Sequence, residues 1–183
     1  MFRFRRPTAD DAAMLLRWRT EPSITRFMFT DLENPDVGRQ RAWLAAMDAR
    51  ADFRHFIIEH EGRPVGYLSY YDIDRVHLRC SSGSYIVEEK DRRRLAGFLH
   101  CFIMDFCFYG LGMNKLFNYF MEGNDTVIRI QRVVKAREVG VLRQHVHKYG
   151  RFHDVHVFET LRSDWEGHPH IFPRETTLAA FAE

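Results

Sequence analysis

With 183 residues, of which 45% are hydrophobic and 14% aromatic, the chain can fold as one domain with its own core, which excludes a disordered protein. Its formal net charge of +2 is too small to indicate nucleic-acid binding. Three cysteines without CxxC spacing, no signal-peptide pattern and no apolar stretch of bilayer length predict a cytoplasmic protein without a membrane partner.

The N-terminal part has the pattern of one strand followed by two helices. Residues 2–5 alternate as a short strand does, and Thr8 with Asp11 forms a capping-box pattern for a helix that ends before Pro22. Pro35 at a first helical position predicts the second helix. The residues expected to face the core from these two helices are Ala12, Leu15, Leu16, Trp43, Leu44 and Met47.

Three strands are expected next. Residues 53–59 and 65–71 have strand patterns and are joined by a hairpin turn at Gly62. Residues 72–75 form a polar connection, and a third strand then reaches Val87.

The stretch from residue 84 onward combines a strand, a charged turn and a helix. Residues 84–87 end the strand and residues 88–94 form the turn, so that an apolar helix begins at Leu95 and breaks at Gly110 and Gly112. Because the first N–H groups of a helix lack intrahelical partners, a basic turn at this place can bind an anion.

Arg92, Arg93 and Arg94 supply the positive charge of this turn. The pattern therefore indicates a phosphate-bearing cofactor. A solvated, arginine-rich connection between two buried elements is an equal alternative on local physics alone.

The remaining elements complete a mixed α/β fold. Residues 116–121 form a strand, a helix begins after Asn124, strands at 139–147 and 152–161 form a last hairpin, and residues 164–183 are expected as a surface tail. The residues expected to turn that helix toward the core are Val127, Ile130 and Val134. The order of elements predicts a largely antiparallel central sheet flanked by helices.

Short motifs spaced along nearly the whole chain carry a family resemblance. They are Gly62–Tyr67, Asp72–Asp74, Gly83–Glu89, Leu111–Leu116, Asn124 with Val127 and Ile128, Gly140–Arg143, Gly150 and Asp154. This set resembles the Gcn5-related N-acetyltransferases. Within them it is most similar to the enzymes that acetylate UDP-linked 4-amino sugars in pseudaminic acid biosynthesis, and next to the ribosomal-protein N-acetyltransferases.

The resemblance implies one acyl-CoA N-acyltransferase domain over residues 1–163, with acetyl-CoA as co-substrate and the amine of a small molecule as acceptor. A nucleotide-linked amino sugar is the acceptor it favours, and a homodimer is a further expectation. Two alternatives stay open: a fold relative that has lost catalysis and acts as a binding or scaffold protein, and a protein N-terminal acetyltransferase.

The resemblance also assigns a cofactor site, although its loop is degenerate. In the family a strand leads into Arg/Gln-x-x-Gly-x-Gly/Ala and a helix, and this motif falls on residues 91–96, where only Ala96 matches while Asp91 and Arg94 replace the Arg/Gln and the central Gly. The implied cofactor-binding residues are Ile86, Val87, Arg92, Arg93, Arg94, Leu95, Ala96, Gly97 and Asn124. The backbone N–H near Ile86 or Val87 would polarise the acetyl carbonyl. The N–H groups of residues 95–97 would meet the pyrophosphate.

The general acid of the family is replaced here. Its position holds Gln131, whose amide can donate a hydrogen bond but cannot give a proton. Tyr85 and Tyr119 are the candidate replacement acids, and the alternative for each is a core tyrosine of a strand.

Four histidines lie in the last hairpin. They are His145 and His147, two apart on one face of a strand, and His153 and His156 on the partner strand. Imidazoles on paired strands can converge on a metal, but exposed sheet histidines are the preferred interpretation, so no metal site is predicted.

Overall fold

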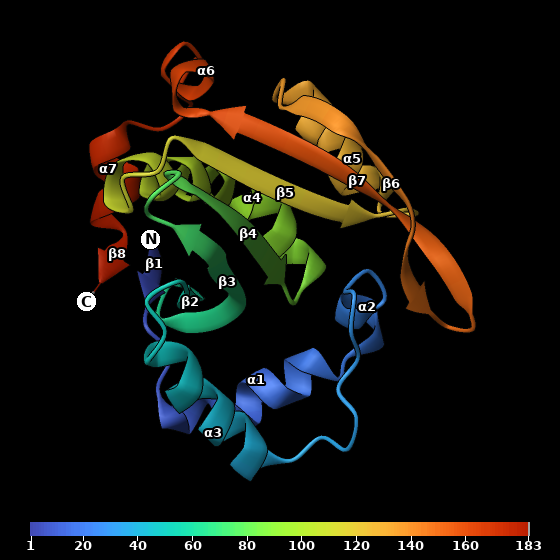
Figure 1. Cartoon of the computed structure of the whole chain (residues 1–183). Coiled ribbons are helices and arrows are strands. Elements are labelled where there is room, and N and C mark those ends of the chain that lie inside the picture. The colour runs from blue at the N-terminus through green and yellow to red at the C-terminus, as the bar shows by residue number, and fades with distance from the viewer. Residues whose placement is uncertain (183) are drawn as a thin grey trace.

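A single eight-stranded sheet organises the computed structural model, which describes residues 1–182 (Figure 1). The strand order is β6-β7-β5-β4-β3-β2-β1-β8. The strands are β1 (Phe2–Arg5), β2 (Arg54–His60), β3 (Arg63–Asp74), β4 (Arg79–Ile86), β5 (Lys115–Met121), β6 (Arg137–Lys148), β7 (Arg151–Leu161) and β8 (Phe181–Ala182). Only the β4–β5 and β1–β8 pairs in this order are parallel. The expected mixed, largely antiparallel sheet is confirmed.

Helices cover both faces of this sheet. They are η1 (Ala9–Asp11), α1 (Ala12–Arg19), α2 (Pro22–Thr25), α3 (Val37–Asp48), α4 (Glu89–Asp105), the π-helical turn η2 (Phe106–Gly110), α5 (Asp125–Val133), α6 (Arg162–Glu166) and α7 (Arg174–Ala179). Helices α1 and α3 pack on one face against Ile57 and Tyr67. Helix α4 and η2 cover the other face and contribute most of the larger core.

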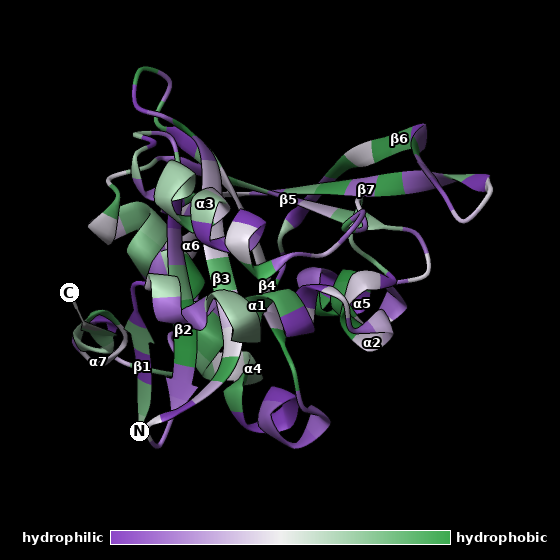
Figure 2. Cartoon of the chain, turned by 90° about the horizontal axis from the view of Figure 1, so that it is seen from below, coloured by the Kyte–Doolittle hydropathy of each residue, from purple (hydrophilic) through white to green (hydrophobic). Residues whose placement is uncertain are grey.

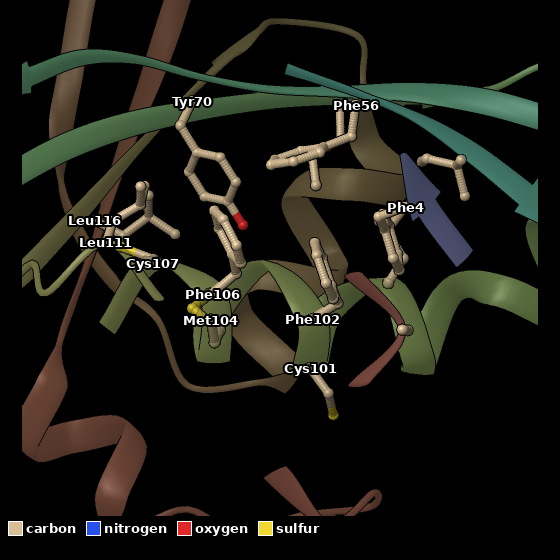
Figure 3. Packing of buried hydrophobic residues seen from close by; sticks show 14 of the residues in the cluster. Phe4, Phe56, Tyr70, Cys101, Phe102, Met104, Phe106, Cys107, Leu111 and Leu116 are labelled. Atoms are coloured by element: carbon tan, nitrogen blue, oxygen red, sulfur yellow. The ribbon is translucent and has the colours of Figure 1, made fainter. Parts of the chain in front are cut away.

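Aromatic rings dominate that larger core (Figure 3). Phe102 of α4 stacks on Phe4 of β1 with ring centroids 3.5 Å apart, and Phe56 of β2 meets Phe102 and Phe106 edge-on. The buried Tyr70 donates its hydroxyl to the carbonyl of Ile103 at 2.9 Å. The core therefore holds α4 against the sheet from Leu95 onward, because buried aromatic rings each remove a large apolar area from water.

Helix α4 begins at Glu89, six residues before the predicted start at Leu95. Its first turn carries Glu89 and Asp91, whose negative charge is favourable at a helix N-terminus. Asp91 is buried and accepts a hydrogen bond from Arg63 at 2.7 Å. The charged segment expected as a turn is therefore mostly the first part of the helix.

Two other predicted boundaries also move. Helix α3 begins at Val37 rather than at Pro35, because the Asp36 side chain caps it by accepting a hydrogen bond from the Arg39 N–H at 2.8 Å. Of its expected core residues Leu44 is buried, whereas Trp43 is 38% exposed. Strand β3 continues to Asp74, so most of the predicted connection at residues 72–75 belongs to the sheet.

The buried face of α5 was predicted one residue out of register. Ile128 and Gln131 are buried, whereas Ile130 is 40% exposed. The sequence pattern predicted that the apolar Ile130 faces the core, but the polar Gln131 is buried there instead.

The segment expected as a surface tail is built into the fold. Trp165 of α6 donates its indole N–H to the buried carboxylate of Asp105 at 2.8 Å, and Thr177 of α7 donates to the same carboxylate at 2.5 Å. Strand β8 pairs in parallel with β1, with Phe181 opposite Phe4. Only residue 183 of this segment lies outside the described residues.

Candidate active site

Strands β4 and β5 begin side by side and then separate. Within the described residues their parallel ladder covers only Arg79–Ser81 and Lys115–Phe117. At the next position Ser82 donates its buried hydroxyl to the side-chain carbonyl of Asn118 at 2.8 Å. We call the opening beyond this bond the fork. Backbone groups of β4 that point into the fork are free to pair with a ligand, as an edge strand pairs with an added strand.

The β4 side of the fork distinguishes the two residues expected to polarise a carbonyl. The Val87 N–H donates to the Val65 carbonyl at 2.9 Å and is engaged in the sheet. Because N–H groups alternate in direction along a strand, the Ile86 N–H points the other way, into the fork. Of the two predicted donors, the Ile86 N–H is therefore the one that can bind a carbonyl oxygen in the fork.

Arg92 closes the outer end of β4. Its guanidinium donates to the carbonyl of Ile86 at 2.8 Å and to that of Val87 at 3.0 Å. Arg93 is exposed and pairs with Glu89 one turn earlier at 2.5 Å, and Arg94 is exposed. The three predicted arginines thus differ, because Arg92 holds the strand–helix junction while Arg93 and Arg94 face solvent.

The N–H groups of residues 95–97 are not free to bind the pyrophosphate, contrary to the prediction for them. Leu95, Ala96 and Gly97 lie in the second and third turns of α4, where backbone N–H groups bond within the helix. Leu95 is also fully buried in the core. Any diphosphate at this helix would meet the first-turn N–H groups of Glu89 and Lys90 and the arginine side chains instead.

Two of the predicted catalytic side chains have a buried polar atom without a partner among residues 1–182. They are the hydroxyl of Tyr85 and the side-chain oxygen of Gln131. Tyr85 stacks on Tyr67 with centroids 5.7 Å apart, and burial raises its pKa well above the ordinary value. A protonated phenol without a partner is suited to donate to a ligand, because an unsatisfied buried polar group is costly.

Tyr119 lies elsewhere, in an acidic cleft of about 470 Å³ beside the start of the fork. The lining residues are Asp52, Asp72, Ile73, Asp74, Arg79, Cys80, Ser81, Phe117 and Tyr119. Two of the carboxylates have ion-pair partners: Asp52 pairs with Arg50 at 2.6 Å and Asp74 with Arg79 at 3.4 Å.

Asp72 is the third carboxylate of the cleft, and among residues 1–182 it has no ion-pair partner within 4.0 Å. Its backbone is left-handed, with φ of 52°, at an irregularity in the β3–β4 pairing. Burial, then Asp72 and Tyr119, raise the pKa of the adjacent Tyr71 to about 12. Asp72 is therefore the one carboxylate lining the cleft that has no such partner among residues 1–182, and the sequence alone did not identify the cleft.

The remaining predicted residues are spread out. Asn124 occupies the N-cap position of α5, where its carbonyl accepts from the N–H of Val127 at 3.1 Å. The histidines of β6 and β7 have separate neighbours: His156 pairs with Glu138 at 2.9 Å, and His153 contacts the Lys148 carbonyl at 3.0 Å.

Two features are absent from residues 1–182. They contain no group of three or more histidine, cysteine, aspartate or glutamate side chains placed to hold a metal. None of the described helices is long and apolar enough to cross a membrane.

Comparison with known proteins identifies the family. The model of the acetyltransferase (GNAT) domain matches residues 2–136. An uncharacterized N-acetyltransferase, p20, from Bacillus licheniformis is 21% identical over 167 residues, covering 89% of this chain and 94% of the relative. A putative ribosomal N-acetyltransferase, YdaF, from Bacillus subtilis (strain 168) is 23% identical over 133 residues, covering 73% and 69%.

The fold has solved relatives. The spermidine N-acetyltransferase from Vibrio cholerae, in complex with CoA and spermine, superposes with a TM-score of 0.84 at 17% identity, covering 91% of this chain and 98% of that one. The chain belongs to the GNAT acetyltransferase family of acyl-CoA-dependent N-acetyltransferases, for which acetyl-CoA is the co-substrate.

Proposed function

We propose that the protein acetylates a primary amine of a small acceptor that carries a second positive charge, such as a diamine or polyamine. The observation that carries this proposal is the cleft beside the fork, whose lining includes the exposed and unpaired carboxylate of Asp72 together with the paired Asp52 and Asp74. A carboxylate attracts an ammonium group, so an acceptor with a second ammonium gains a favourable charge contact in the cleft.

The residues around the fork fit acetyl-CoA as co-substrate, which supplies a thioester-linked acetyl group when bound. The Ile86 N–H can donate to a carbonyl oxygen held in the fork. The exposed Arg93 and Arg94 are within the first turns of α4, where a phosphate can receive charge-assisted hydrogen bonds. Arg92 has a different role, because its guanidinium already binds β4 carbonyls.

The three candidate acids, like the three arginines, have different roles. Tyr85 keeps its proton at neutral pH because burial raises its pKa, and its hydroxyl has no partner among the described residues. It is therefore the proposed proton donor at its Oη atom. Gln131 can offer only a hydrogen bond, and Tyr119 forms part of the cleft wall.

Asp72 is the proposed anchor for the distal charge of the acceptor. It is exposed and has no ion-pair partner within 4.0 Å among residues 1–182, so its carboxylate can pair directly with a bound ammonium. The structural relative in complex with CoA and spermine is named a spermidine N-acetyltransferase, which supports the same class of acceptor.

Two other acceptors remain to be compared. The diphosphate of a nucleotide-linked amino sugar would meet repulsion from the cleft carboxylates, so the cleft does not favour it, and that acceptor stays a prediction. Protein N-termini are the acceptor suggested by the relative named a putative ribosomal N-acetyltransferase.

Asp72→Asn tests the proposal with little disturbance, because asparagine tolerates left-handed backbone and has the same shape. For a diamine, KM should rise about fivefold, which corresponds to about 1 kcal/mol for an exposed ion pair. For a monoamine of similar length, KM should stay the same. Asp10→Asn, an exposed carboxylate with no role in the cleft, is the matched control. A KM for the diamine that is the same in Asp72→Asn as in wild type would remove the cleft from acceptor binding.

The homodimer stays a prediction. Figure 2 shows the β6–β7 hairpin extending from the body of the domain with hydrophobic stretches along it. Val139, Val141 and Leu142 of the edge strand β6 are 50%, 44% and 39% exposed. Sedimentation of the purified protein would measure its oligomeric state.

A further inference from the structure

A buried lysine at the end of β6 joins the last hairpin to the segment that follows α2. The side chain of Lys148 is only 5% exposed. Its Nζ atom donates to the carbonyls of Thr25 and Met28, both at 2.8 Å, and lies 2.8 Å from a carboxylate oxygen of Asp31. A lysine ammonium has three N–H donors, so each of them has an acceptor here. We call residues 24–31, which include these three acceptors, the α2 segment.

The hairpin gives Lys148 a fixed position. Lys148 pairs with Arg151 across a loop of Tyr149 and Gly150, whose φ angles are 52° and 73°. Positive φ at both central residues is typical of a type I′ turn, whose twist matches that of the flanking strands. The Lys148 carbonyl also accepts a hydrogen bond from Nε2 of His153 at 3.0 Å. The backbone that carries the lysine is therefore held by the turn and by the partner strand.

The α2 segment has little regular structure of its own. Helix α2 is four residues long, and residues 26–36 between it and α3 form neither a helix nor a strand. A segment with so few hydrogen bonds of its own opens locally at low cost unless contacts with the rest of the protein hold it. The three contacts with the Lys148 ammonium are of this kind.

The α2 segment packs against both arms of the fork (Figure 1). On the β4 side, Ile24 is part of a buried apolar cluster, and both Met28 and Tyr85 pack against that cluster. On the β5 side, Phe27 and Tyr119 pack against a second buried cluster. The segment therefore bridges the two strands where they separate.

The bridge lies on the face of the sheet to which both tyrosines point. Ser81 of β4 is opposite Phe117 of β5 in the parallel ladder, so their side chains share a face. Side chains two or four residues apart along a strand also share a face. Tyr85 is four residues after Ser81, and Tyr119 is two residues after Phe117. The α2 segment therefore covers the fork on the side of Tyr85, the proposed proton donor.

We propose that Lys148 is a positioning residue for the acceptor: it holds the α2 segment across the fork and so fixes one wall of the site that receives the amine. This inference rests on the proposed function, because it takes the fork as the place where the amine is acetylated. Lys148 touches neither reactant in this role and acts through residues 24–31. The Asp31 carboxylate at 2.8 Å offsets its charge, which weakens the repulsion of a cationic acceptor.

Lys148→Met removes the three donors while keeping an unbranched side chain of similar length. The Thr25 and Met28 carbonyls then lose a charged donor, and apolar contacts alone hold the α2 segment. Amide hydrogen exchange in residues 24–31 should become about tenfold faster, the effect of losing one hydrogen bond from a charged group. The acceptor KM should rise about tenfold, whereas kcat should change less than about threefold. The affinity for acetyl-CoA should stay the same, because the start of α4 is not altered.

A second variant and a control complete the set. Asp31→Ala removes a side chain that is 47% exposed and leaves the two carbonyl contacts in place, so the acceptor KM should rise by about threefold. Thr177→Val is the matched control for lost stability. It removes the buried hydrogen bond to Asp105 at the end of α4, on the opposite face of the sheet, and should lower Tm without changing the acceptor KM.

The probes are acetyl-CoA and spermidine, or a peptide amine if wild type does not turn spermidine over. A higher acceptor KM and faster exchange in Lys148→Met, with neither in Thr177→Val, is the result expected. Faster exchange with an unchanged acceptor KM would show a tether without a role in acceptor binding and would overturn the proposal. If Lys148→Met does not fold, a wild-type acceptor KM in Asp31→Ala overturns it instead. Wild type that acetylates no amine removes the proposed function and this role of Lys148 with it.

Discussion

Replacing Arg92 with alanine separates the arginine that holds the strand–helix junction from those that face solvent. In the structure Arg92 makes two hydrogen bonds to the carbonyls of Ile86 and Val87. At roughly 1 kcal/mol net for each such bond, the variant should lose about 2 kcal/mol of unfolding free energy. For a domain of this size that is a fall of about 4–8 °C in Tm.

The other two arginines should behave in the opposite way. Arg93 makes an exposed ion pair with Glu89, which contributes little to stability. Arg93→Ala and Arg94→Ala should therefore melt within about 2 °C of wild type. Each should weaken acetyl-CoA binding by about fivefold, the effect of losing one exposed charge contact of about 1 kcal/mol. The effect should grow at low salt, because screening then weakens.

Thermal melts and calorimetric titration of acetyl-CoA into wild type and the three variants make the comparison. The reasoning is refuted if Arg92→Ala melts as wild type does but binds acetyl-CoA much more weakly, since Arg92 would then be a ligand contact. If all three variants bind acetyl-CoA with the affinity of wild type, the diphosphate does not lie at the start of α4.

Three further perturbations test the packing of the domain. Burial lowers the pKa of His100 to about 4, below its value near 6.5 in the unfolded chain. The contribution of His100 to the free energy of unfolding is therefore complete above pH 6.5 and is lost as the pH falls toward 4. Urea denaturation should show a loss of up to about 3 kcal/mol at the lower pH, and His100→Gln should flatten this decline. Gly66→Ala should cost more than about 3 kcal/mol in the same assay, because a Cβ would overlap the Tyr85 backbone carbonyl oxygen of β4, and unchanged stability would contradict this packing. Asp105→Ala should cost about 3 kcal/mol by removing the acceptor of the buried Trp165 indole; a wild-type Tm would show that the C-terminal helices do not depend on it.

Much of the fold could be read from the sequence because local signals agree with it. The Thr8–Asp11 capping pattern, the glycine turn at Gly62 and the strand at residues 116–121 each rest on neighbours in sequence, and the structure has them. These signals fix the order of elements, and with it the mixed sheet.

The errors arise where a distant partner decides. The charged residues after Val87 read as a turn because nothing local shows that Arg63, on another strand, would bury Asp91. Residues 164–183 read as a tail because the partner of Trp165 is a carboxylate 60 residues earlier.

The candidate site was only partly predictable for the same reason. Gln131 was identified by its alignment with the family's general-acid position and Tyr85 as a candidate replacement acid, and both have an unpartnered buried polar atom among the described residues. The acidic cleft depends on an irregular β3–β4 register that places Asp72 next to the fork. The contacts of His55 with Asp48 and Tyr67 join three elements. Sequence spacing does not contain either arrangement.

The acceptor specificity of the purified protein tests the central claim most directly. Release of CoA from acetyl-CoA should be measured with spermidine, a diamine, a UDP-linked 4-amino sugar and a peptide with a free N-terminus, with the acetylated products identified by mass. The acidic cleft predicts turnover with spermidine and the diamine, falling as salt is raised because exposed charges are screened. Turnover confined to the amino sugar or the peptide, or with no acceptor at all, would contradict it.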